Sequence, residues 1–337
     1  MGALAFLLTL LALPAPVAAL ESVFADGFES GVIDLEAWNP QVYDVVEGAT
    51  LVSAPSGAPV RNGQYALRIK LEPTDLDPSG KSRSELRPRS RPDELAYRAG
   101  FGVPHVYTFS LFLPSDWQAD APEIVAQWHG KPDENAAGEA IEPLRSPPLA
   151  LRTTYLEQPP LSGNFVPAWN VVAHWDASPQ TAEDGSSVHL VTLLPPTDAS
   201  PDLGQWVDWR FEVTWDWNPE GSGSVRVIKN GQPIAHYAGP NAFRDDQGPN
   251  SKIGLYKWTW PTSVDLRVAF YDEIRIERDT TALSALGHAA RLLLPGLLLL
   301  AALGHFRNKN RRLACRNGAP VPSSGVEADT DTPEDGP

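Results

Sequence analysis

One stretch of the sequence concentrates cations in a way that could bind an anionic ligand. The stretch GKSRSELRPRSRPDELAYRAG (80–100) lies in a chain whose formal net charge is −15. In a β-strand, alternate side chains point to the same face, so one face here would carry Lys81, Arg83, Glu85, Arg87, Arg89 and Arg91. Cations gathered around one carboxylate repel each other unless water or an anion lies among them. Two interpretations stay open: a solvated strand edge whose cations discourage edge-to-edge pairing, or the floor of an anion-binding groove.

Two further runs carry side chains that could move a proton. In IVAQWHG (124–130), Gln127 and His129 share one face of a strand and Trp128 points to the other. The run SKIGLYKWTW (251–260) places on one face Lys252, Gly254, Tyr256 and Trp258. The glycine leaves space for something to approach the strand closely. Taken singly, such a histidine is more often structural than catalytic, and a tyrosine beside a tryptophan usually belongs to a packed core.

These runs need a scaffold of strands, and the rest of the sequence predicts one. Helix signals are nearly absent between residues 20 and 280, where short alternating runs are separated by Pro, Gly, Asn and Asp. The clearest strands are VYTFSLFLP (106–114), QWVDWRFEVTWDW (205–217), a hairpin around Asn230-Gly231 (225–234) and LRVAFYDEIRIE (266–277), which could pair with 23–31. The Pro-rich segments 143–148, 157–167 and 195–201 are expected to form loops. The pattern predicts an all-β, antiparallel β-sandwich of the jelly-roll type, with one sheet curved into a groove.

Composition limits the classes of partner and cofactor. An acidic protein is a poor nucleic-acid ligand, so we expect no nucleic-acid partner. The single cysteine, Cys315, lies near the C-terminus, so the domain has no disulfide and a structural zinc site is not expected. We therefore expect no required cofactor, although structural calcium held by carboxylates stays open. We expect a monomer.

The two ends of the chain differ from the domain between them. Residues 1–19 contain an apolar run with Val17 and Ala19 at the −3 and −1 positions of a cleavage site, which predicts a signal peptide that lacks the usual basic start. Residues 281–306 predict a transmembrane or sorting segment, interrupted by Arg291 and Pro295. The tail 307–337 is first basic (RNKNRR) and then of disordered composition. We expect an exported protein, anchored at its C-terminus, whose domain faces the periplasm or the exterior.

Three motifs, in order, resemble those of a known enzyme family. The runs RSELR (83–87), QWH (127–129) and KIGLYK (252–257) resemble the signature strands of jelly-roll polysaccharide lyases, which have a concanavalin A-like fold. Alginate lyases carry R-(S/T)-E-L-R, Q-(I/V)-H and K-A-G-x-Y. The heparin lyase I and glucuronan lyase group is more similar, because WVDW (206–209) and KNG (229–231) also match its pattern. The resemblance covers roughly residues 22–278, and Trp128 replaces the small aliphatic residue of the alginate enzymes.

The resemblance implies a lyase that cleaves an acidic, uronate-containing polysaccharide by β-elimination and leaves unsaturated uronate ends. It implies the catalytic residues His129, Tyr256, Gln127 and Arg83, and the substrate-binding residues Arg87, Arg89, Lys252, Trp258 and Lys81. Gln127 and Arg83 would neutralise the substrate carboxylate. His129 and Tyr256 would supply the base and the acid, in either assignment, and Lys252 would lower the pKa of Tyr256 or bind a neighbouring carboxylate. Glu85 is expected to orient the arginines.

Two other classes compete with this interpretation. A glycoside hydrolase on a similar sandwich needs two carboxylates across the scissile bond, and the sequence has no E-x-D-x-x-E strand. A non-catalytic, concanavalin A-like carbohydrate-binding module would also use Trp and Arg, but would not need His129 and Tyr256 on facing strands. The motifs leave open whether the polymer is glucuronan, alginate or heparin-like, and whether cleavage is endo or exo.

Overall fold

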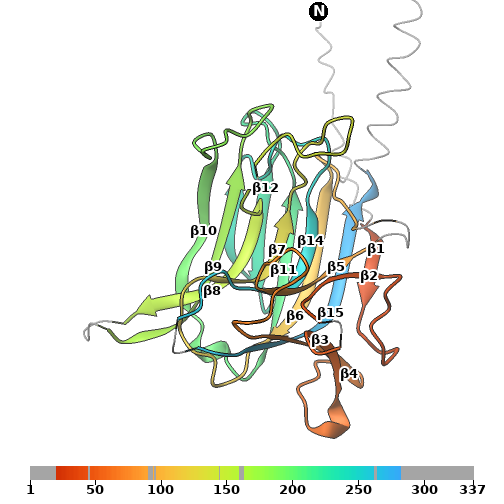
Figure 1. Cartoon of the computed structure of the whole chain (residues 1–337), viewed down its shortest axis with the longest axis vertical. Helices are drawn as coiled ribbons and strands as arrows, with labels where there is room; N and C mark the ends of the chain where they lie inside the picture. The colour runs from red at the N-terminus through yellow and green to blue at the C-terminus, as the bar shows by residue number, and fades with distance from the viewer. Residues whose placement is uncertain are drawn as a thin grey trace, which may run out of the picture. The chain divides into compact units, whose positions relative to one another are not determined.

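The computed structural model describes residues 20–44, 46–89, 94, 96–143, 145–158, 163–261 and 264–281 (Figure 1). The predicted signal peptide (1–19), Arg91, and the predicted anchor and tail from residue 282 onward lie outside these ranges. Within them, no helix has both the length and the apolar character needed to cross a membrane.

The described residues form two antiparallel sheets, which confirms the predicted all-β sandwich. The eight-stranded sheet has the order β13 (Gln232–Ala238), β12 (Ser224–Lys229), β11 (Trp206–Thr214), β6 (Pro104–Phe112), β15 (Arg267–Asp279), β4 (Tyr65–Leu71) and β3 (Ala49–Ser53), and β1 (Leu20–Asp26) pairs with β15. The seven-stranded sheet has the order β10 (His189–Asp198), β9 (Phe165–Trp175), β8 (Leu149–Glu157), β7 (Glu123–His129), β14 (Asn250–Tyr256), β5 (Arg83–Pro88) and β2 (Trp38–Gln41). Two short 3₁₀ turns, Ala54–Ser56 and Ser200–Asp202, complete the regular structure of this part of the chain.

The core lies between the two sheets and is rich in aromatic side chains. The predicted alternation of β11 is correct, because Trp209, Phe211 and Trp215 are each at most 1% exposed. Trp128 of the opposite sheet packs on Phe211, with ring centroids 4.6 Å apart, and on Tyr107 at 5.3 Å. These large rings bury much apolar area and pack the inner faces of the two sheets against each other.

The local turn predictions are also confirmed. Asn230 and Gly231 have φ angles of 49° and 76°, as a type I′ turn requires, and they join β12 to β13. The predicted pairing of the last strand with the first is present, with Phe24 opposite Ile276.

The Pro-rich segment 195–201 differs from its prediction as a loop. Strand β10 continues to Asp198 and includes Pro195 and Pro196. A strand can hold two consecutive prolines there because β10 is the edge of its sheet and its pairing with β9 is irregular between Leu194 and Thr197. Similarly, β9 begins at Phe165 and takes in the last residues of the predicted loop 157–167.

Candidate active site

A groove of about 690 Å³ lies on the outer face of the seven-stranded sheet. Strand alternation explains which side chains face it. Trp128, Ile253 and Leu255 point into the core and are at most 4% exposed, so their sequence neighbours point outward. The lining residues are Gln41, Ser79, Lys81, Arg83, Arg87, Arg98, Ile124, Gln127, His129, Gly130, Arg145, Ser146, Pro147, Arg152, Asn250, Lys252, Tyr256 and Trp258.

The groove gathers every predicted site residue except Arg89. Strand β5 ends at Pro88, and the backbone N–H of Arg89 donates to the carbonyl of Ala37. The strict alternation that placed Arg89 beside Arg87 therefore no longer applies at that position. Lys81 precedes β5 and still lines the groove.

Register places the catalytic candidates in successive rows across the sheet. Tyr256 lies opposite Arg83 on one side and Ile124 on the other. Lys252 lies opposite Gln127, and Asn250 lies opposite His129. Residues that are far apart in the sequence thus share one face of three adjacent strands, β5, β14 and β7.

A buried carboxylate holds the centre of the groove floor together. Glu85 is fully buried and accepts a hydrogen bond from Nε2 of Gln127. Lys252 Nζ lies 3.8 Å from its Oε2, and Arg83 Nη1 lies 4.0 Å away. Glu85 thus positions Gln127, and of the two arginines that it was expected to orient, Arg83 and Arg87, it approaches Arg83, at 4.0 Å. The Gln127 amide keeps a second N–H that Glu85 Oε1 does not use.

Arg83 is fixed from one side. Its Nε donates to Asp77 Oδ2 at 2.5 Å, and its Nη2 donates to Ser79 Oγ at 3.2 Å. A guanidinium has five donors in a rigid fork, so these contacts orient it and leave donors for a ligand carboxylate.

His129 is a neutral imidazole with a defined tautomer. Burial, together with the charge of Lys252, lowers its pKa to about 3. Nδ1 lies 2.6 Å from the backbone carbonyl of Gly130. A carbonyl only accepts, so Nδ1 carries the proton and Nε2 keeps its lone pair. The ring is therefore unprotonated at neutral pH, although a pKa this far below neutrality makes it a weak base in the free enzyme.

Tyr256 is a protonated phenol beside an exposed indole. Burial raises its pKa, and the nearby charge of Arg83 opposes that rise. Arg83 therefore has the effect on the pKa of Tyr256 that was predicted for Lys252. The pKa of Lys252 is itself lowered to about 8 by burial, against the attraction of Glu85. The Tyr256 and Trp258 rings meet edge to face at 5.6 Å.

Gly254 allows strand β5 to lie close to the backbone of β14. Its φ is 130°, a conformation that side-chain-bearing residues rarely adopt. A Cβ at this position would lie 2.7 Å from the Cα of Glu85 and still closer to the carbonyl oxygen of Ser84. What approaches the glycine is thus β5, and the pairing of β14 with β7 shifts register between Ile253 and Tyr256. The irregularity sets how Tyr256 pairs with Ile124 of β7, while the pairing of Tyr256 with Arg83 of β5 is regular.

The sequence motifs missed three arginines of the groove. Arg145 is neutralised, because it pairs with Glu142 at 3.2 Å and Asp245 at 2.7 Å. Arg98 donates to the carbonyl of Gly248 at 3.1 Å. Arg152 lies on β8 next to Ile124. The period-2 pattern of LALRTTYLE (149–157) places Arg152 on the outer face, but nothing in the sequence says which strand it adjoins.

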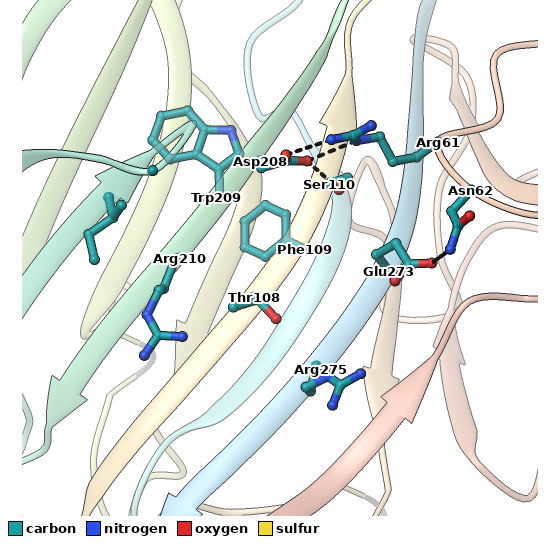
Figure 2. Close-up of a pocket in the computed structure, with 12 residues that line it drawn as sticks. Arg61, Asn62, Thr108, Phe109, Ser110, Asp208, Trp209, Arg210, Glu273 and Arg275 are labelled. Atoms are coloured by element: carbon teal, nitrogen blue, oxygen red, sulfur yellow. Dashed lines mark hydrogen bonds and ion pairs between the residues drawn. The ribbon is translucent and has the colours of Figure 1, made fainter. Parts of the chain in front are cut away.

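A second cavity, of about 480 Å³, lies on the outer face of the eight-stranded sheet (Figure 2). Its charges largely satisfy one another. Arg61 pairs with Asp208 at 2.8 Å, Ser110 Oγ donates to the same carboxylate, and Asn62 donates to Glu273 at 3.1 Å (Figure 2). Because these charges are already paired, this surface has fewer free cations for a polyanion than the groove has. Among the described residues, no group of three or more His, Cys, Asp or Glu side chains could hold a metal ion.

The fold and the groove define a jelly-roll protein suited to an extended anionic ligand. The family model described as "Polysaccharide lyase" matches residues 49–275. The chain belongs to this family and is a polysaccharide lyase, as the three motifs predicted.

Solved structures of such enzymes are among those similar to this chain. An endo-β-1,4-glucuronan lyase from the fungus Trichoderma reesei is 16% identical, with a TM-score of 0.48 over 71% of this chain and 93% of that one. The family 7 alginate lyase A1-II′ is 17% identical, with a TM-score of 0.45 over 76% and 99%. An alginate lyase from Pseudomonas aeruginosa is 18% identical, with a TM-score of 0.41 over 72% and 99%. No curated protein sequence matches the chain.

Proposed function

We propose that this polysaccharide lyase cleaves a uronate-containing polymer by β-elimination in the groove of the seven-stranded sheet. The observation that carries the proposal is that a neutral imidazole, His129, and a protonated phenol, Tyr256, line the same cationic groove. A base and an acid of opposite protonation states are what an elimination needs.

The first task is to make the C5 proton of the uronate acidic. Its removal places charge on the adjacent carboxylate, so groups that neutralise that carboxylate stabilise the enolate-like intermediate. Arg83 and the unused N–H of Gln127 can hold the two carboxylate oxygens, because Asp77 and Glu85 fix their orientation from behind. Charge-assisted hydrogen bonds of this kind are among the strongest in proteins.

The proton transfers then follow from the protonation states. Nε2 of His129 takes the C5 proton, and the C5–H electron pair forms the C4–C5 double bond. The C4–O4 bond breaks, and the departing oxygen takes the phenolic proton of Tyr256. Proton transfer through solvent returns both residues to their starting states. In a syn elimination Tyr256 could perform both transfers, with Arg83 stabilising its phenolate.

Lys252, Arg87 and Lys81 supply positive charge along the groove, and Trp258 supplies a face on which a sugar ring can stack. The rival function, a carbohydrate-binding module without catalysis, would use the same arginines and tryptophan. It gives no reason for a neutral imidazole and a protonated phenol that line the same groove.

The test is to incubate the full chain with a panel of uronate polymers and follow the ultraviolet absorbance of the unsaturated product. Product from at least one polymer supports the proposal. Binding without any unsaturated product would favour the carbohydrate-binding module.

We also propose that the enzyme is exported and attached to a membrane at its C-terminus. Support comes from the sequence of residues 1–19, the apolar segment 281–306 and the basic run 307–312, which the positive-inside bias keeps in the cytoplasm. Fractionation of the full chain against a chain that ends at Asp279 tests the attachment. Equal recovery of both in the soluble fraction would rule the anchor out.

A further inference from the structure

Arg152 occupies a position that the catalytic scheme does not use. Register joins four strands in one row: Arg152 on β8 lies opposite Ile124 on β7, which lies opposite Tyr256 on β14, which lies opposite Arg83 on β5. Tyr256 thus has a guanidinium on each side. Neighbouring strands are about 4.8 Å apart, so the backbones at Arg83 and Arg152 are separated by roughly 14 Å. That span exceeds one pyranose ring.

Within the described part of the chain, the Arg152 guanidinium lacks a counter-charge. Arg83 pairs with Asp77, and Arg145 pairs with Glu142 and Asp245. Among the described residues, Arg152 has no carboxylate within ion-pair distance, and its buried Nε has no hydrogen-bond partner. Burial alone lowers its pKa. Keeping a cation partly buried without a partner costs free energy, and an anionic ligand would recover that cost.

The neighbour of Arg152 is an exposed aromatic ring. The guanidinium carbon lies 5.9 Å from the centre of the Trp258 ring, within cation–π range. Trp258 is 47% exposed although both it and Arg152 line the groove. An exposed indole next to an uncompensated guanidinium can stack on a sugar ring and bind its acidic substituent at the same time.

We propose that Arg152 and Trp258 form a second subsite, which binds an anionic sugar adjacent to the reacting uronate. The inference rests on the proposed function, in which Arg83 and Gln127 hold the carboxylate of the reacting uronate and Tyr256 lies at its leaving oxygen. The enzyme then requires acidic groups on neighbouring sugars. A polyuronate meets this requirement with carboxylates, and a sulfated glycosaminoglycan meets it with sulfate on the hexosamine. An unsulfated polymer that alternates uronate with N-acetylhexosamine does not meet it.

The experiment compares the full chain with Arg152→Gln on four polymers: polyglucuronate, alginate, heparin and unsulfated hyaluronan. For the native enzyme we expect kcat/KM on the best polyuronate to exceed that on hyaluronan at least tenfold. A charged hydrogen bond contributes about 1.5–3 kcal/mol, so Arg152→Gln should lower kcat/KM on the polyuronate roughly ten- to hundredfold. Its effect on hyaluronan should stay within about threefold. Cleavage of heparin, sensitive to the same variant, would identify sulfate as a second accepted anion.

Two controls keep the result specific. Arg210→Gln removes an exposed arginine from the other sheet, where it pairs with Glu212, and should leave all rates unchanged. Arg152→Lys keeps the charge but loses the planar fork, so it should recover part of the polyuronate rate.

Equal losses on polyuronate and hyaluronan in Arg152→Gln, or equal native rates on both polymers, would overturn the second subsite. Calorimetry in the Tyr256→Phe background separates this inference from the proposed function, because binding needs no turnover. If the native chain yields no unsaturated product, the proposed function fails. The subsite is still judged by whether Arg152→Gln weakens polyuronate binding at least tenfold, and unchanged affinity would refute it.

Discussion

The charge of Lys252 should set an alkaline limit on activity. Its pKa is about 8, because burial disfavours the ammonium form more than Glu85 at 3.8 Å favours it. The amine is therefore charged in roughly nine-tenths of molecules at pH 7 and roughly one-tenth at pH 9. Losing a charged contact with the polyanion costs about 1.5–3 kcal/mol. We expect kcat/KM, which reports ionisation of the free enzyme, to fall several-fold between pH 7 and pH 9 with a midpoint near 8.

Glu85→Gln tests the origin of that midpoint. At an effective dielectric constant of about 20, a carboxylate 3.8 Å from an ammonium group favours its charged form by about 4 kcal/mol. Without that attraction the pKa of Lys252 falls below neutrality. The variant should have a flat kcat/KM between pH 7 and pH 9, at or below the level that the native enzyme approaches above pH 9, because Glu85 also orients Gln127.

Lys252→Met provides the matched comparison, since it removes the amine and leaves Glu85 in place. It should give the same flat profile, and thermal melting of each variant shows whether the fold is retained. The reasoning is refuted if native kcat/KM does not change through pH 8, or if Glu85→Gln and Lys252→Met both retain the native midpoint.

Three further predictions address the other groups of the site. His129→Ala and Tyr256→Phe should each lower kcat by about 10²–10⁴-fold at an unchanged melting temperature, the range expected for a positioned acid or base; near-native turnover would remove that residue from the scheme. Arg87→Ala should raise KM and weaken its salt dependence, because salt screens the attraction between the groove cations and a polyanion. Arg89→Ala, outside the groove lining, should change KM less than twofold, and equal effects of the two variants would place both residues in the site. Gly254→Ala should destabilise the fold by roughly 2–6 kcal/mol in denaturant unfolding, the sum of a disfavoured φ and an overpacked contact; a loss below about 1 kcal/mol would mean that β5 moves aside freely.

Which side chains face the groove was predictable from the sequence, because strand alternation is a local property. Trp128 in the core implies that Gln127 and His129 point outward, and Ile253 and Leu255 imply the same for Lys252 and Tyr256. The Asn-Gly turn was predictable for the same reason, since its positive φ angles depend on two adjacent residues. The order of three motifs along the chain was enough to predict the enzyme family, which the family model over residues 49–275 confirms.

The neighbours of each groove side chain were decided by the tertiary structure alone. Strand order and register depend on contacts between residues far apart in the sequence, so no local pattern indicates that Tyr256 lies between Arg83 and Arg152. The net charge that the groove presents to a ligand also depends on residues far apart in the sequence. Arg145 is neutralised by Asp245, a hundred residues away, while Arg152 keeps its charge uncompensated among the described residues. Alternation on a strand places a cation on the right face, but only the packed sheet determines whether that cation is already paired.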